Sequence, residues 1–229
     1  MKKHFDEISL IWNDAYPPSS PRPRTLIEKI ICILTILVAS ISLGNFKDVI
    51  RHRFPGSHLF MDLYVIGWFL FLLCVLFFGG QWCSVAVLAL VAYRLLDIFN
   101  YRVYFLFVKS ETSPWTAKIV RRSVAIALTN FLESIVAFAI LYQRTESVVQ
   151  SGTATAIGSA TDALYFSFVT MTTLGYGDYV PGTTLGRWLV MCELSTTILF
   201  VLFLLPALMS VFSPALIEKE REKDKEKEK

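Results

Sequence analysis

Five apolar segments constrain the fold of this 229-residue chain more than any other feature. Each is near the roughly 20 residues that an α-helix needs to cross the hydrocarbon core of a bilayer. Charged residues make up only 18% of the chain and gather between these segments, which leaves too little polar surface for a soluble domain. We therefore expect an all-α membrane protein. The expected hydrophobic helices are approximately Leu26 to Leu43, Leu59 to Phe78, Trp82 to Val108, Ser123 to Tyr142 and Leu185 to Val211.

The net charge is too small to indicate a nucleic-acid partner. It is +3, and no basic cluster alternates with the aromatic residues on which bases stack. The cysteines lie inside apolar segments, at spacings that fit neither a metal site nor an extracellular disulfide framework. We interpret them as packing residues.

A different pattern lies between the fourth and fifth apolar segments. A loop rich in Ser, Gly and Thr runs from Arg144 to Thr161, and a short helical run from Asp162 to Thr172 precedes two glycines. This run has about one-half of the length that spans a bilayer. It suits a re-entrant helix, which is tolerated at membrane depth where protein or a water-filled cavity surrounds its irregular end.

The residues at the end of this short run form the most specific motif of the chain. The sequence Thr170-Met171-Thr172-Thr173-Leu174-Gly175-Tyr176-Gly177-Asp178, with an apolar helix on each side, resembles the signature of potassium channels. The resemblance covers about Ser123 to Pro214 and includes Pro181 and the Gly186-Arg187 pair. It implies an outer helix, a re-entrant pore helix, a selectivity filter and an inner helix. It also implies a homotetramer, in which four copies surround one pore, with about three further hydrophobic helices before the pore domain.

The backbone chemistry of the motif supports the same interpretation. A dehydrated potassium ion needs a cage of oxygen dipoles, which consecutive backbone carbonyls supply when all of them face one axis. Gly175 and Gly177 tolerate positive φ, so alternate residues can adopt left-handed dihedrals that keep the carbonyls pointing inward. We expect no cofactor and no metal site apart from K⁺ in the filter. The expected ion-binding residues are Thr173, Leu174, Gly175, Tyr176 and Gly177.

Three neighbouring residues are expected to support the filter. In many potassium channels an aromatic residue of the pore helix donates a hydrogen bond to the acid that follows the filter. Tyr165 stands at such a position and has a hydroxyl, so we predict a bond from Tyr165 to Asp178; simple aromatic packing is the alternative. Thr172 lies at the carboxyl end of the pore helix, whose partial negative charge favours a cation in the cavity.

The inner helix departs from the usual pattern of potassium channels. Thr197 occupies the position where many members of the family have a hinge glycine, whereas Pro206 removes a helical hydrogen bond further along. We predict a kink at Leu205-Pro206 that defines the intracellular gate. Residues one turn apart are expected to face the cavity, and packing against the outer helix is the alternative. These residues are Thr197, Val201, Leu205 and Met209.

Charged residues inside the apolar segments should be paired, because an unpaired charge is costly in a bilayer. With a rise of about 1.5 Å per residue, Arg94 and Glu133 reach similar depths on antiparallel helices. We predict an intramembrane ion pair between them; snorkelling or pairing of Arg94 with Asp97 are the alternatives. In the segments before the pore domain, Arg94 and Arg102 are the only arginines inside a predicted span, and they are too far apart for a voltage-sensing ladder. Weak or no voltage dependence is therefore expected.

The orientation follows from the resemblance, which places the carboxyl end of the inner helix in the cytoplasm. The chain is then a multi-pass protein of the cell membrane. Counting backwards places the amino end outside, but it lies inside if the first helix is interfacial or if Trp82 to Lys109 holds two short spans. The expected parts are a proline-rich tail (1–25), upstream transmembrane helices (26–109), a basic intracellular linker (110–122), the pore domain (123–214) and a charged tail (215–229).

The function predicted from these features is passive, selective conduction of potassium ions across a lipid bilayer. A potassium transporter subunit is less favoured, because such proteins usually fuse four degraded filters in one chain. The intact filter argues against a nonconducting accessory protein, and Tyr176 argues against a nonselective cation channel. A membrane enzyme is not expected, because no nucleophile or metal-ligand cluster accompanies the buried charges.

Overall fold

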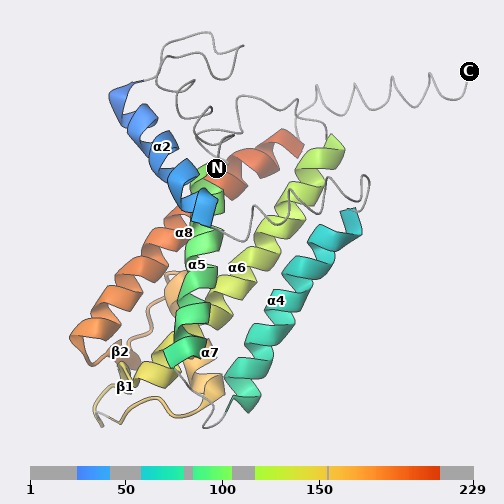
Figure 1. Cartoon of the computed structure of the whole chain (residues 1–229). Coiled ribbons are helices and arrows are strands. Elements are labelled where there is room, and N and C mark those ends of the chain that lie inside the picture. Colours follow the sequence, from blue (N-terminus) through green and yellow to red (C-terminus); the bar gives the residue numbers. More distant parts are fainter. Residues whose placement is uncertain (1–24, 42–57, 80–84, 105–116, 154, 212–229) are drawn as a thin grey trace, which may run out of the picture. The chain divides into compact units, whose positions relative to one another are not determined.

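A computed structural model describes residues 25–41, 58–79, 85–104, 117–153 and 155–211. This part of the chain is mostly helical (Figure 1). The elements in order are α2 (Leu26–Ile41), α4 (His58–Phe78), α5 (Val85–Tyr104), α6 (Ala117–Thr145), β1 (Val148–Gln150), α7 (Ala160–Met171), β2 (Tyr179–Pro181) and α8 (Thr184–Val211).

Each apolar segment of the sequence coincides with a helix, as does the short run before the motif. Two features differ from expectation. Residues 117–122, predicted as linker, form the first turns of α6, and α5 is one continuous helix, which contradicts two short spans in that region. The small sheet was also not expected from the all-α prediction. The predicted tails, at 1–24 and 212–229, lie outside the described residues.

Two of the described helices are long and apolar enough to cross a membrane by length and composition. They are Val124–Thr145 within α6 and Thr184–Leu202 within α8, which are the predicted outer and inner helices. A shorter apolar helix covers Leu63–Phe78. The length of α6 and α8 therefore allows each to span a hydrocarbon core of about 30 Å.

The chain divides into two compact units. One comprises Met1–His58, Asp97–Arg122 and Pro206–Lys229, and the other comprises Leu59–Leu96 and Ser123–Leu205. Within the first unit, the side-chain amide of Asn100 donates to the backbone oxygen of Thr35 at 3.3 Å. The second unit contains the motif.

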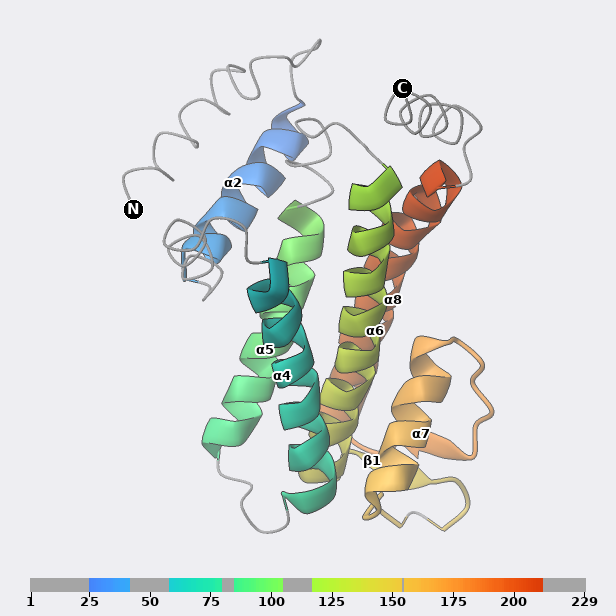
Figure 2. The same cartoon turned by 90° about the vertical axis from the view of Figure 1, so that its right-hand side faces the viewer.

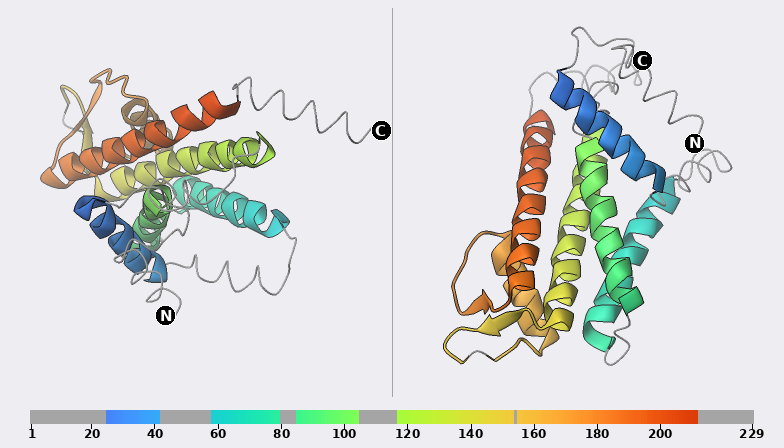
Figure 3. Two further views of the ribbon diagram at one scale, coloured as in Figure 1. Left: turned by 90° about the horizontal axis from the view of Figure 1, so that it is seen from above. Right: turned by 60° about the vertical axis from the view of Figure 1, so that its left-hand side comes forward.

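Helix α6 is the centre of the second unit. Every residue from Glu133 to Tyr142 is buried, and a helix buried on all sides must be surrounded by other elements. Figures 2 and 3 show α6 between α8 on one side and the parts of α4 and α5 that belong to this unit on the other. Phe131 on α6 packs edge-on against Phe200 on α8 with ring centroids 5.3 Å apart.

The short helix α7 lies beside α6 and α8 (Figure 2). Phe166 on α7 packs edge-on against Tyr142 on α6, with ring centroids 4.9 Å apart. The Ser167 hydroxyl, next along α7, contacts the Ile135 carbonyl oxygen on α6 at 2.8 Å. These buried contacts fix the position of α7, and hence of the motif that follows it.

Candidate functional site

The start of α7 is fixed by a side-chain cap. The hydroxyl oxygen of Ser159 accepts hydrogen bonds from the backbone N–H groups of Thr161, at 3.1 Å, and of Asp162, at 3.5 Å. Asp162 lies in the first turn, where a carboxylate stabilises the positive end of the helix dipole. These contacts determine where this 12-residue helix begins.

The carboxyl end of α7 is bonded to the segment that follows it. The Thr172 hydroxyl donates to the Phe168 carbonyl oxygen at 2.7 Å, and the Leu174 N–H donates to the Val169 carbonyl oxygen at 3.0 Å. Both bonds satisfy carbonyl groups in the last turn of a helix, which need partners outside the regular pattern. Thr172 therefore lies at the junction of the helix and the motif, where a supporting residue was predicted.

The Thr173–Gly177 segment alternates between two backbone conformations. Thr173, Gly175 and Gly177 have φ angles of 59°, 57° and 78°, and the two residues between them are not in this region. A Cβ atom on either glycine would meet nothing within 4 Å, so conformation rather than space requires glycine. Thr173 adopts positive φ despite its branched side chain, a strained state that is concentrated at functional sites.

One face of this segment is uncovered in the single chain. The side chains of Leu174 and Tyr176 are 56% and 67% exposed. Large apolar side chains with such exposure are available to contact further protein. The segment therefore has a free face that further protein can cover.

Two tyrosines lie beside Asp178, the acid after the segment. The pKa of Tyr165 is raised, mainly by a hydrogen bond with Asp178. The structure therefore brings together the two residues predicted to pair. The Tyr165 ring also packs edge-on against the Tyr179 ring, with centroids 6.2 Å apart. Burial, followed by the charge of Asp162, raises the pKa of Tyr179.

A two-stranded antiparallel sheet holds the far end of the segment. Strand β1 follows α6 and pairs with β2, so that Val149 lies opposite Val180. The Ser151 N–H donates to the Asp178 carbonyl oxygen at 2.8 Å, next to this sheet. The motif is thus anchored at both ends, by α7 before it and by the sheet after it.

Residues 127–213, which include all of this site, match the family model described as "Ion channel". The motif, its alternating backbone and this match all indicate the pore of an ion channel. These residues belong to the potassium-channel pore-domain superfamily. The matched range lies inside 123–214, the range predicted to be the pore domain. Over these residues the chain therefore resembles ion channels, which are membrane proteins and not enzymes.

The chain is also similar to larger channels that have been characterised. It is 31% identical over 171 residues to "Potassium voltage-gated channel subfamily KQT member 1" of Squalus acanthias, covering 71% of this chain and 24% of that relative. The proteins of the same name from Xenopus laevis and Homo sapiens are 30% identical over the same length, covering 25% and 24% of those relatives. The chain thus spans about a quarter of the length of these relatives. No solved structure matches the chain significantly.

The inner helix of the pore domain presents its residues differently from expectation. Thr197 is only 7% exposed, and its hydroxyl donates to the Glu193 carbonyl oxygen at 3.1 Å, so it packs within the chain instead of facing a cavity. Val201 is 51% exposed and remains available to face one. The backbone of α8 stays helical to Val211, and the side chains of Leu205, Pro206 and Met209 lie outside the described part.

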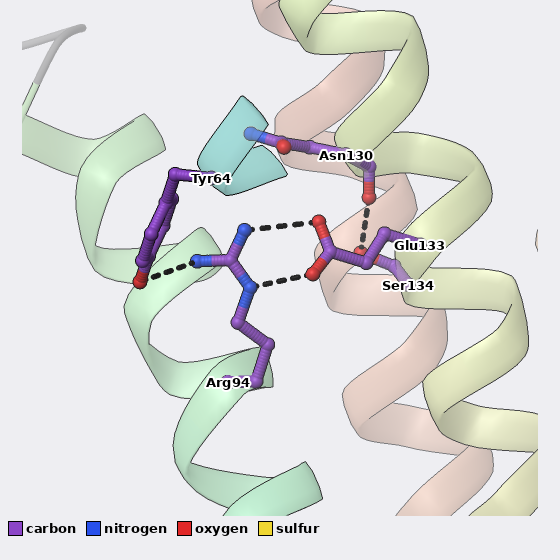
Figure 4. A network of polar contacts seen from close by, with 5 residues as sticks. All are labelled: Tyr64, Arg94, Asn130, Glu133 and Ser134. Atoms are coloured by element: carbon purple, nitrogen blue, oxygen red, sulfur yellow. Dashed lines mark hydrogen bonds and ion pairs between the residues drawn. The ribbon is translucent and has the colours of Figure 1, made fainter. Parts of the chain in front are cut away.

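An ion pair joins α5 to the outer helix of the pore domain (Figure 4). Arg94 Nε lies 2.5 Å from Glu133 Oε1, and Arg94 Nη2 lies 3.0 Å from Glu133 Oε2. The side chains are 3% and 0% exposed. This two-pronged geometry is the strongest form of an arginine–carboxylate contact. The structure therefore brings together the two charges predicted to pair.

Aromatic residues of α4 also lie beside Arg94. The Arg94 guanidinium carbon lies 5.2 Å from the Tyr64 ring centroid and 5.4 Å from that of Trp68, both within cation–π range. Arg94 Nη1 also donates to the Tyr64 hydroxyl at 3.5 Å (Figure 4). The single arginine thus connects three helices of the second unit.

One buried acid of the pore domain was not identified from the sequence. Glu193 on the inner helix is fully buried, and its carboxyl oxygens lie 2.6 Å from the Tyr142 hydroxyl and 2.5 Å from the Ser167 hydroxyl. The available signal was a glutamate in the middle of an apolar segment of spanning length, which indicates a functional group by default.

Proposed function

We propose that this chain is a subunit of a potassium-selective channel, which conducts K⁺ passively across the lipid bilayer. The observation that carries the proposal is the alternation of positive φ at Thr173, Gly175 and Gly177. This alternation directs consecutive carbonyl oxygens to one side, where they replace the hydration shell of the ion. The relatives named above are potassium channels by name, which supports the same cargo.

The surrounding elements suit a cation. The carboxyl end of α7 carries the negative end of its helix dipole and is directly followed by the filter. The Thr173 hydroxyl adds a further oxygen at the inner end of the filter. K⁺ is the transported ion, and the pore needs no cofactor.

We propose a homotetramer, because one chain contributes only one strand of carbonyl oxygens and an ion must be surrounded. The exposed side chains of Leu174 and Tyr176 are then covered by neighbouring copies. The mass of the purified protein in native nanodiscs tests this arrangement. Four copies per particle are expected, whereas strictly single copies would contradict the proposal.

We propose a multi-pass arrangement with a cytoplasmic carboxyl end. Arg121 and Arg122, at the start of α6, then lie on the cytoplasmic side, as the positive-inside rule prefers. The outer helix consequently runs outward and the inner helix runs back.

We also propose that the channel depends only weakly on voltage, although the relatives are voltage-gated by name. A sensor helix needs several arginines at three-residue spacing, and α5 carries only Arg94 and Arg102. Arg94 is also held by Glu133 and two aromatic rings, which opposes its movement along the field.

A liposome flux assay tests the proposed function. Vesicles loaded with K⁺ and containing the full chain should release it passively when the membrane potential is clamped by a protonophore. Vesicles loaded with Na⁺ should release it far more slowly. Equal release of both ions would favour a nonselective cation channel and would contradict the proposal.

A further inference from the structure

Glu193 is the acid that joins the three helices of the pore domain. It lies on α8, and its partners Tyr142 and Ser167 lie on α6 and α7. All three residues are fully buried, with an exposed fraction of 0% for Glu193, Tyr142 and Ser167. The carboxyl group therefore lies at the point where the outer helix, the pore helix and the inner helix meet.

The protons available to this cluster can be counted. The Ser167 oxygen lies 2.5 Å from Glu193 Oε1 and 2.8 Å from the Ile135 carbonyl oxygen. A serine hydroxyl has one proton, so it can donate to only one of these two oxygens. If Glu193 were ionised, one of the two short oxygen–oxygen contacts would have no proton between the atoms.

A protonated carboxyl group satisfies every contact. Tyr142 then donates to Glu193 Oε2, Glu193 Oε1 donates to the Ser167 oxygen, and Ser167 donates to the Ile135 carbonyl oxygen. The partners of the carboxyl group are hydroxyls, and no cation pairs with Glu193 among the residues that the structure describes. An ionised carboxylate buried without a cation is strongly disfavoured, so burial acts in the same direction as the proton count.

From this geometry we propose that Glu193 is a neutral carboxylic acid that positions the pore helix, with its proton shared with Ser167. Ser167 lies in the 12-residue α7, which leads directly into the Thr173–Gly177 filter. A displacement of α7 would displace the filter oxygens, because Leu174 and Val169 bond the two together. Glu193 is thus a positioning residue for conduction. This role in conduction, unlike the protonation of Glu193, rests on the proposed function.

Two substitutions distinguish a neutral Glu193 from an ionised one. Glu193→Gln keeps the shape and can both accept from Tyr142 and donate to Ser167, so K⁺ flux within about twofold of the wild type is expected. Glu193→Leu leaves both hydroxyls without this partner, and a loss of flux of about tenfold or more is expected. Ser195→Ala is the matched control, because this exposed α8 hydroxyl donates to the Met191 carbonyl oxygen of its own helix. Full activity in Glu193→Leu, or loss in Glu193→Gln with retained folding, would overturn the proposal.

Infrared spectroscopy tests the proton without depending on channel activity. The wild-type minus Glu193→Gln difference spectrum at neutral pH should contain the carbonyl stretch of a protonated carboxylic acid. Carboxylate bands alone would overturn the inference. An acid band in a protein that passes K⁺ and Na⁺ equally would retain the neutral Glu193 and reject only the proposed function.

Discussion

The Arg94 guanidinium and the Glu133 carboxylate face each other across α5 and α6, with Nη2 donating to Oε2 at 3.0 Å. The two residues are separated by 39 positions in the sequence, and both side chains are buried. Each charge removes much of the penalty that the other would incur away from water. The pair therefore holds α5 against the outer helix of the pore domain.

Removal of either charge alone should destabilise the protein more than removal of both. Arg94→Leu or Glu133→Leu leaves one buried charge without its partner, at a cost of about 3–5 kcal/mol. The Arg94→Leu/Glu133→Leu double variant should recover much of this loss. A double-mutant cycle on thermal unfolding in detergent measures the coupling, and additive effects would show that the pair is not a functional unit.

The exchanged pair, Arg94→Glu with Glu133→Arg, is a second measure of the same contact. It should restore assembly only partly, because Tyr64 and Trp68 would then lie beside a carboxylate instead of a guanidinium. Complete failure to rescue Glu133→Arg would count against the bridge.

Tyr165→Phe should hasten the loss of conduction during sustained opening. The substitution removes the hydroxyl that bonds to Asp178 and keeps the ring that packs on Tyr179. Asp178→Ala should act in the same direction, and the double variant should add little, because each substitution removes the same hydrogen bond. The decay of macroscopic current in membrane patches measures this loss of conduction. An unchanged decay rate in Tyr165→Phe would show that Tyr165 acts through aromatic packing and not through its hydroxyl.

Cysteine substitution distinguishes the buried and exposed faces of the inner helix. Val201→Cys should be blocked by a thiol reagent applied from the intracellular side, because Val201 is 51% exposed in the single chain. Thr197→Cys should react slowly or not at all, because Thr197 is 7% exposed. Faster block of Thr197→Cys than of Val201→Cys would show that Thr197 lines the cavity.

Gly186→Ala should destabilise the junction between the outer helix and the inner helix. A Cβ atom at Gly186 would lie 2.4 Å from the Ser147 carbonyl oxygen, so the backbone must move, at a cost of about 1–3 kcal/mol. Gly67→Ala is the control, because a Cβ there meets nothing within 4 Å. Thermal unfolding followed by tryptophan fluorescence measures both, and equal midpoints would contradict this explanation of Gly186.

The helices and the left-handed glycine conformations of the motif could be predicted because their signals are local. Apolar length defines the spanning helices, and glycines at alternate positions indicate the left-handed conformations now seen at Gly175 and Gly177. The depth of Arg94 and Glu133 followed from the rise of a helix. Each of these features depends only on the spacing of residues along the chain.

The remaining features depend on which residues meet in space. Helix α8 is apolar on most of its circumference, so periodicity does not reveal that Thr197 faces inward and Val201 outward. The strands β1 and β2 have three residues each, too short for an alternating pattern. The contacts of Glu193 are with Tyr142 and Ser167, which lie 51 and 26 positions away in the sequence, so its role could not be predicted from its neighbours along the chain.

In the proposed channel, the alternating backbone at Thr173–Gly177 selects K⁺ over Na⁺. The reversal potential of the reconstituted channel, with K⁺ on one side of a planar bilayer and Na⁺ on the other, measures this selectivity. Each tenfold preference moves this potential by about 59 mV. The wild type and Gly67→Ala should show a large displacement toward K⁺ selectivity, and Gly175→Ala, which cannot easily adopt positive φ, should lose it. A wild-type reversal potential near zero would contradict K⁺ selectivity at Thr173–Gly177.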